Sequence, residues 1–358
     1  MEGVQSIRMK SRTGNRRFQK RTHFLLITVV VALLVNFIRL PLYVTYPGEA
    51  EALDRMISVE DGYADDGDFM LTTIRIGKAN LVQTIWASLS EYQYLLPENH
   101  VQAEWENDEE YFQRQLQMMD HSQQSALIVA YRMTNKPLTV TNEGVIVSGL
   151  IPGMPAGSKL EVGDVIKKVD GQAVGTAEAL LQLIEQKEQG DVIDLVIERQ
   201  GDEKKVSLTV APFPESYRSD GGKKKAGIGI VGPVTKRSIE TNPPVTFHTD
   251  GIGGPSAGLM FALEIYNQLT ETDLTKGYAI AGTGEINEDG SVGAIGGIKQ
   301  KVVAANRAGA DMFFAPVAGG NAEEAKEAAS DIRTDMEIVP VETFRDAVEY
   351  LKGLKNAG

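Results

Sequence analysis

An apolar run near the N-terminus constrains this chain more than any other feature. Residues 24–38 read FLLITVVVALLVNFI, and Asn36 is the break in the run. Fifteen helical residues rise only about 22 Å against a hydrocarbon core of about 30 Å. Arg39 must therefore extend its charge to the interface, while residues 40–46 supply the outer boundary. The sequence predicts one transmembrane helix at residues 23–46.

The charges around this run predict its orientation. Residues 1–22 form a basic tail that carries seven Lys and Arg side chains against Glu2 alone, whereas acidic residues such as Glu49 and Glu51 follow the run. By the positive-inside rule the tail is cytoplasmic and everything after Pro47 is extracytoplasmic. A cleaved signal peptide has the same charge order, but no clean small-x-small site follows the run, so an uncleaved anchor in the cell membrane is favoured.

Composition bounds the remaining possibilities. The 358 residues, 42% apolar and 24% charged, suffice for two or three globular domains. Because the chain has no cysteine, a thiol nucleophile, disulfides and cysteine-ligated metal are excluded, and its four histidines show no ligand spacing. We expect no metal and no cofactor. The net charge of −13, which becomes more negative once the basic tail is set aside, argues against a nucleic-acid partner.

The region after the predicted anchor carries no recognisable chemistry. Residues 47–130 are interpreted as an acidic extracytoplasmic α/β region. Residues 69–76 alternate like a strand, and the period of residues 111–119 indicates a helix that packs or acts as a spacer.

Residues 131–212 predict a small β-rich domain. Its segment PGMPAGSKLEVGDVIKKVDGQAV resembles the PDZ domains of bacterial proteases. That resemblance implies a groove beside the helix at residues 176–186, where an extended peptide could add as a strand. The strand expected to border this groove consists of Gly144, Val145, Ile146 and Val147. A domain that only packs, gates or spaces its neighbour is the alternative, and residues 213–225 are expected to form an exposed linker.

Residues 226–358 alternate strands with helices, which predicts an α/β domain. The complete fold class is thus mixed: a transmembrane helix, a β-rich PDZ-like domain and an α/β domain. Within GIGGPSAG, Gly254 allows a sharp turn, Pro255 suits a first helical position, and Ser256 with Ala257 would then lie at a helix N-terminus. Unpaired N–H groups there could stabilise an oxyanion, although ordinary capping would give the same pattern.

A nucleophilic serine also needs a base, and GGIKQK offers two lysines. At about 100° per residue, Lys301 shares a helix stripe with Ile298 and Ala305, whereas Lys299 lies on another face. Burial of Lys301 would have to lower its pKa by about three units for it to act as a base near neutral pH. A lysine that merely extends its ammonium to solvent is the alternative.

Together these motifs resemble the Lon protease family. The family's proteolytic domain carries a PSAG serine, a TGEI segment and GG-x-K-x-K, and this chain has them at residues 255–258, 283–286 and 296–301. The resemblance implies a serine endopeptidase with Ser256 as nucleophile, Lys301 as base and Thr283 orienting the lysine. It also implies assembly into homo-oligomeric rings.

The order of tail, apolar run, PDZ-like domain and protease-like domain is similar to the SepM/YlbL-like family of Gram-positive bacteria. No GxxxxGK[ST] occurs in the sequence, so we expect cleavage without ATP, directed at peptides and at unfolded or exposed protein segments. Gly253 is a departure, because ATP-dependent relatives usually carry an acidic residue there.

Three other interpretations stay open from sequence. His248 and Asp250 precede Ser256 and suggest a Ser-His-Asp triad, although residues two apart need not converge. GIGGPSA imitates a dinucleotide fingerprint, but Pro255 occupies the tight turn. An inactive PDZ scaffold or receptor at the membrane belongs to a different class; such a protein would lack Ser256 or Lys301, and both are present.

Overall fold

The computed structural model describes residue 26 and residues 39–103, 106–214, 226–249 and 251–357. The chain divides into two compact units, one from residues 1–47 and 74–101 and one from residues 48–73 and 102–358. Each unit is described by itself.

The first unit is small and β-rich. The first half of β1 (Arg39–Ala52) pairs antiparallel with β4 (Tyr94–Pro97). Helix α2 (Leu81–Ala87) follows β3 (Asp68–Asn80), and the Asn80 side chain caps it by accepting from the Gln83 N–H. A short helix, α3 (Glu98–Val101), ends the unit. Its core is a cluster of Val44, Ala79 and Ala87.

The predicted transmembrane helix is wrong for its last third. Residues 39–46 lie in β1, where Tyr43 and Val44 are buried, so they belong to a folded sheet. Residues 23–25 and 27–38 lie outside the described residues. Within the described part of the chain, no helix combines the length and apolarity needed to cross a bilayer.

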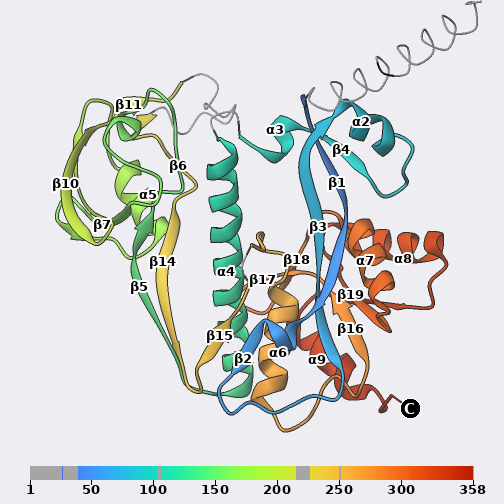
Figure 1. The fold of residues 1–358 in the computed structure, drawn as a ribbon. Helices are drawn as coiled ribbons and strands as arrows, with labels where there is room; N and C mark the ends of the chain where they lie inside the picture. Colours follow the sequence, from blue (N-terminus) through green and yellow to red (C-terminus); the bar gives the residue numbers. More distant parts are fainter. Residues whose placement is uncertain (1–25, 27–38, 104–105, 215–225, 250, 358) are drawn as a thin grey trace, which may run out of the picture. The chain divides into compact units, whose positions relative to one another are not determined.

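The second unit contains a parallel sheet covered on both faces (Figure 1). Its order β20-β19-β16-β3 is parallel throughout. Neighbouring side chains alternate between two cores: Phe314 packs with α4, α6 and α9, whereas Phe313 packs with α7 and α8. The elements are β16 (Ala279–Gly282), β19 (Met312–Pro316), β20 (Glu337–Val341), α4 (Asp108–Thr134), α6 (Gly258–Leu269), α7 (Ile298–Ala308), α8 (Asn321–Ile332) and α9 (Phe344–Gly353).

Residues 47–130 do not form a separate region, so that domain prediction is wrong. The second half of β1, β2 (Ile57–Val59) and the first half of β3 fold with the α/β sheet, and β2 pairs with β15 (Val245–Phe247) far along the chain. Helix α4 packs against α6 in the same core. Of the two roles predicted for the helix at residues 111–119, packing or spacing, the structure supports packing, because α4 buries residues from Met119 to Tyr131.

The β-rich domain is inserted between α4 and β15. Its sheet has the order β10-β9-β7-β5-β14, and its own core surrounds Val145, Ile166 and Leu180. The strands and helix are β5 (Leu138–Ile146), β6 (Gly149–Leu150), β7 (Val165–Val169), β8 (Gln172–Ala173), α5 (Ala177–Glu185), β9 (Val192–Arg199), β10 (Asp202–Thr209), β11 (Ala211–Pro212), β12 (Ala226–Gly227), β13 (Ile230–Val231) and β14 (Val234–Thr241).

The expected boundary at residue 226 is also wrong. Ile228 is buried in the core of the β-rich domain, and β14 pairs with β5 in the register Val234↔Ile146. The domain therefore extends to Thr241, and the chain returns to the α/β fold at β15. The remaining residues of the predicted linker, 215–225, lie outside the described residues.

Candidate active site

Ser256 and Lys301 meet in the α/β fold. The Lys301 Nζ lies 2.7 Å from the Ser256 Oγ, 2.9 Å from the Thr283 Oγ1 and 3.0 Å from the carbonyl oxygen of Thr72. All three partners accept hydrogen bonds from the amine. The sequence prediction of Ser256, Lys301 and Thr283 as one constellation agrees with this geometry, whereas Thr72 was missed.

Helix α7 explains the position of Lys301. The helix begins after Gly297, whose φ of 73° is a left-handed conformation that glycine adopts without strain. Lys301 is 2% exposed and lies among apolar helix residues such as Val302. Burial lowers the pKa of Lys301 to about 7. A substantial fraction of the amine is therefore neutral near neutral pH, as a general base requires.

The neighbouring Lys299 provides an internal comparison. Its Nζ lies 2.9 Å from the Glu327 carboxylate on a partly exposed face. The predicted division of the two lysines between different helix faces is confirmed, because one is buried at Ser256 and the other is paired at the surface.

The loop that carries Ser256, residues 251–257, differs from its predicted form; it is called the nucleophile loop below. Helix α6 begins at Gly258, so Ser256 precedes the helix and Pro255 is not its first residue. The Ser256 carbonyl leaves the helical hydrogen-bond pattern because it accepts from the Gly284 N–H at 2.8 Å and from the Thr283 hydroxyl at 2.9 Å. Leu259 N–H in turn donates to Gly284 O. These bonds join the nucleophile loop to the turn after β16.

Two backbone donors beside Ser256 remain available. Among the described residues, the N–H groups of Ser256 and Ala257 have no hydrogen-bond acceptor. Gly254, predicted to support the site, instead supplies its N–H to the Gln115 carbonyl at 2.9 Å, and Pro255 has no N–H. An oxyanion at this site would therefore meet Ser256 and Ala257, not Gly254.

Helix α4 also contacts the nucleophile loop. The Ser122 hydroxyl donates to the Pro255 carbonyl at 3.0 Å. A Cβ on Gly253 would lie 2.7 Å from the Gln115 Cβ, so any larger residue there requires α4 to shift. This close approach gives a packing reason for the glycine where ATP-dependent relatives carry an acid. The contribution of α4 was missed, because its sequence shows only helical periodicity.

The triad alternative does not fit the described geometry. His248 is exposed, and its backbone N–H donates to Met56 O. Asp250 lies outside the described residues. Lys301 is the basic side chain that reaches the Ser256 hydroxyl.

The predicted peptide-binding strand is wrong. Val145 and Ile146 pair with β7 on one side and with β14 on the other, and Val147 exchanges backbone bonds with the turn before β7. Gly144 is likewise opposite Lys236 of β14. A peptide cannot add to a strand whose two edges are occupied.

A groove lies elsewhere in the β-rich domain. A cavity of about 860 Å³ is lined by α5, including Leu181 and Ile184, and by residues 226–230. In the sequence, residues 227–231 (GIGIV) were predicted to be a strand, but they were assigned to the α/β domain and not to the β-rich domain.

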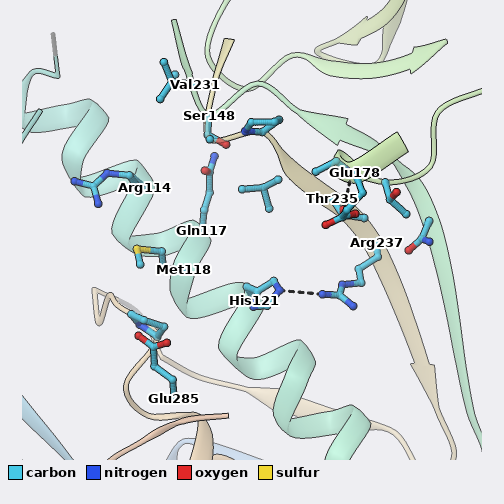
Figure 2. Close-up of a pocket in the computed structure, with 18 of the residues that line it drawn as sticks. Arg114, Gln117, Met118, His121, Ser148, Glu178, Val231, Thr235, Arg237 and Glu285 are labelled. Carbon is cyan, nitrogen blue, oxygen red and sulfur yellow. Dashed lines mark hydrogen bonds between the residues drawn. The ribbon is translucent and has the colours of Figure 1, made fainter. Parts of the chain in front are cut away.

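Figure 2 shows residues that line a second cavity, of about 850 Å³. Pro255 and Glu285 line it near Ser256, while α4 and β14 form other walls. At the wall of this cavity, the His121 Nε2 of α4 lies 2.9 Å from the Arg237 Nη2 of β14. Burial raises the pKa of Glu285 at this cavity.

Comparisons with known proteins match both domains. Residues 249–352 match the C-terminal proteolytic domain of Lon protease (S16), and residues 120–210 match the PDZ domain. Lon protease of Aster yellows witches'-broom phytoplasma is 37% identical over 26% of this chain and 11% of its own length. Lon protease of Campylobacter jejuni is 38% identical over 27% of this chain and 12% of its own length.

The chain thus spans about an eighth or less of these relatives. Among solved structures, the PDZ domain of an SdrC-like protein from Listeria monocytogenes is 24% identical, with a TM-score of 0.23, and the match covers 26% of this chain and 90% of that domain. Residues 120–210 are thus similar to PDZ domains, and residues 249–352 are similar to the Lon-type (S16) proteolytic domain.

Proposed function

We propose that this chain is a serine endopeptidase with a Ser256–Lys301 dyad. The observation that carries the proposal is the 2.7 Å separation between the Lys301 Nζ and the Ser256 Oγ, in a setting that buries the amine. Neutral Lys301 takes the proton of Ser256 as its oxygen attacks a peptide carbonyl. The resulting ammonium then gives that proton to the leaving amine, and water hydrolyses the acyl-enzyme in a second, equivalent step.

Two threonines support this cycle. Thr283 contacts both members of the dyad, because its hydroxyl accepts from Lys301 and donates to the Ser256 carbonyl. The Thr72 carbonyl accepts a further Lys301 N–H, which directs the amine. The backbone N–H groups of Ser256 and Ala257 are the donors proposed for the oxyanion.

We further propose that the protease is membrane-anchored, extracytoplasmic and independent of ATP. The basic tail, the apolar residues 24–38 and the acidic body support this topology, and the absence of a P-loop in the sequence supports action without an unfoldase. Substrates are then secreted peptides, exposed tails or unfolded proteins. Protease added outside intact cells should remove the PDZ and catalytic domains; their protection would contradict this topology.

The PDZ domain is proposed to capture extended peptide segments at the groove beside α5. The apolar side chains that line that groove, including Leu181 and Ile184, suit the burial of apolar side chains of a bound peptide. Assembly into a ring is a further proposal from the Lon resemblance. Sedimentation of the detergent-solubilised chain tests it, and a purely monomeric species that still cleaves would exclude it.

The test of the dyad is cleavage of casein by the full chain in detergent without ATP. Wild type should cleave it, whereas Ser256→Ala and Lys301→Ala should not, with circular dichroism unchanged. The full chain is needed because truncation at Pro47 would remove part of β1. If wild type cleaves no unfolded substrate, the inactive-scaffold alternative becomes the better account. If His248→Ala abolishes cleavage while Lys301→Ala does not, the triad is correct.

A further inference from the structure

The first unit exposes an apolar helix face that its own fold does not cover. Helix α2 and the residues after it present Leu81, Val82, Ile85, Trp86 and Leu89, which are 37%, 46%, 58%, 66% and 81% exposed. Their spacing places them on one side of a helix, while Ala87 on the other side enters the small core. A contiguous apolar patch that includes tryptophan marks an interaction surface.

The strand arrangement places this face close to the start of β1. The Glu49 N–H lies 3.0 Å from the Thr73 Oγ1, and Val44 packs with Ala79. The earlier residue of β1, Val44, thus lies beside the later residue of β3, Ala79, and Glu49 lies beside Thr73. The two strands are therefore antiparallel. Arg39, the first residue of β1, therefore lies beside the end of β3 from which α2 begins.

The sequence immediately before Arg39 indicates what covers this apolar face. Residues 24–38 are the most apolar run of the chain and directly precede β1. We propose that Leu81, Val82, Ile85, Trp86 and Leu89 form a lipid-docking face that inserts into the interface of the bilayer entered by residues 24–38. This inference rests on the proposed membrane anchoring.

A lipid surface fits the chemistry of the face. A tryptophan flanked by aliphatic side chains is typical of helices that lie in the membrane interface. A bilayer also requires no complementary shape, so a two-turn helix suffices. Docking would give the first unit a second attachment beside the apolar run and restrict its tumbling above the membrane.

Tryptophan fluorescence tests the docking with the full chain. Trp86 and Trp105 are the two tryptophans, so Trp105→Phe leaves Trp86 as the sole probe. The protein is reconstituted in phosphatidylcholine vesicles with or without lipids brominated on their acyl chains. We expect blue-shifted Trp86 emission that brominated lipids quench at least about twofold, as for an interfacial side chain. The matched control is Trp105→Phe/Trp86→Phe/Tyr63→Trp, whose probe replaces a 47% exposed tyrosine in the second unit and should not be quenched.

The outcomes separate docking from anchoring. If the protein floats with vesicles but Trp86 is unquenched by brominated lipid, docking is overturned and anchoring stands. Blue-shifted but unquenched emission that depends on protein density would assign the face to a second copy and also overturns docking. Failure to float overturns both. As a second variant, Ile85→Glu/Leu89→Glu should reduce Trp86 quenching by brominated lipid while casein cleavage in detergent is unchanged; equal quenching would contradict the proposal.

Discussion

The proposed catalytic centre and the proposed peptide groove are built in opposite ways. At the centre, Lys301 and Thr283 are buried, and short hydrogen bonds tie both to Ser256. The groove is open and mainly apolar, between the α5 face and residues 226–230. The centre therefore depends on fixed positions and a perturbed pKa, whereas the groove depends on apolar contact area. Single-atom changes should damage the first far more than the second.

The largest expected effect is loss of the base. Lys301→Met should lower kcat/KM by about 10³-fold or more, because no other described side chain reaches the Ser256 Oγ. Lys299→Met on the same helix is the control and should stay within about twofold, since its ion pair with Glu327 is partly exposed. Steady-state kinetics on casein-derived peptides compares them; equal losses would show that α7 merely needs its positive charge.

Glu264 tests whether burial alone makes a group catalytic. This acid lies in α6, and burial raises its pKa to about 8. Because the folded pKa lies above the unfolded one, stability is lost as pH rises from about 4.5 to 8. Glu264→Gln should remove this loss and gain roughly 2 to 4 kcal/mol at pH 8 relative to pH 5. Urea denaturation measures it. An equal gain at both pH values would contradict the sign, and a fall in kcat would give Glu264 a role beyond stability.

Thr283 should have an intermediate effect as a positioning residue. Thr283→Val keeps the buried volume but loses the bonds to Lys301 and to the Ser256 carbonyl. We expect kcat to fall about 10- to 100-fold with KM little changed. Thr283→Ser restores the hydroxyl and should recover most of the rate. A serine variant as slow as the valine variant would mean that the methyl group, through packing, is what matters.

The smallest effect is expected at the groove. Ile184→Asp places a charge in the cavity beside α5 and should raise KM for long unfolded substrates about threefold to tenfold, without changing kcat on short peptides. Val192→Asp, at a 58% exposed position outside the groove lining, is the control. If both variants bind long substrates alike, the groove is not the capture site.

The same contrast explains what sequence could predict. Ser256, Lys301 and Thr283 lie in local motifs, and helical periodicity alone is enough to assign Lys301 and Lys299 to different faces of α7. The α/β alternation after residue 245 was also predicted. These features depend on residues within one or two helical turns.

Pairing between distant segments was not predictable in the same way. The strand containing Val145 is bounded by β14, about ninety residues further on, because sheet registry is set by long-range pairing. Thr72 acts through its backbone carbonyl, which no side-chain motif reports. Helix α6 starts at Gly258 and not at the predicted Pro255, because hydrogen bonds from Thr283 and Gly284 hold the Ser256 carbonyl out of the helix.

The most direct test of the dyad is the rate at which a fluorophosphonate modifies Ser256 as a function of pH. Peptide mass spectrometry identifies the modified residue, and Lys301→Met is the matched variant. We predict modification at Ser256 with a rate that rises with pH through about 7, where the buried Lys301 amine loses its proton. The variant should lack this rise. Modification of a different serine, or an identical pH profile in Lys301→Met, would contradict the account.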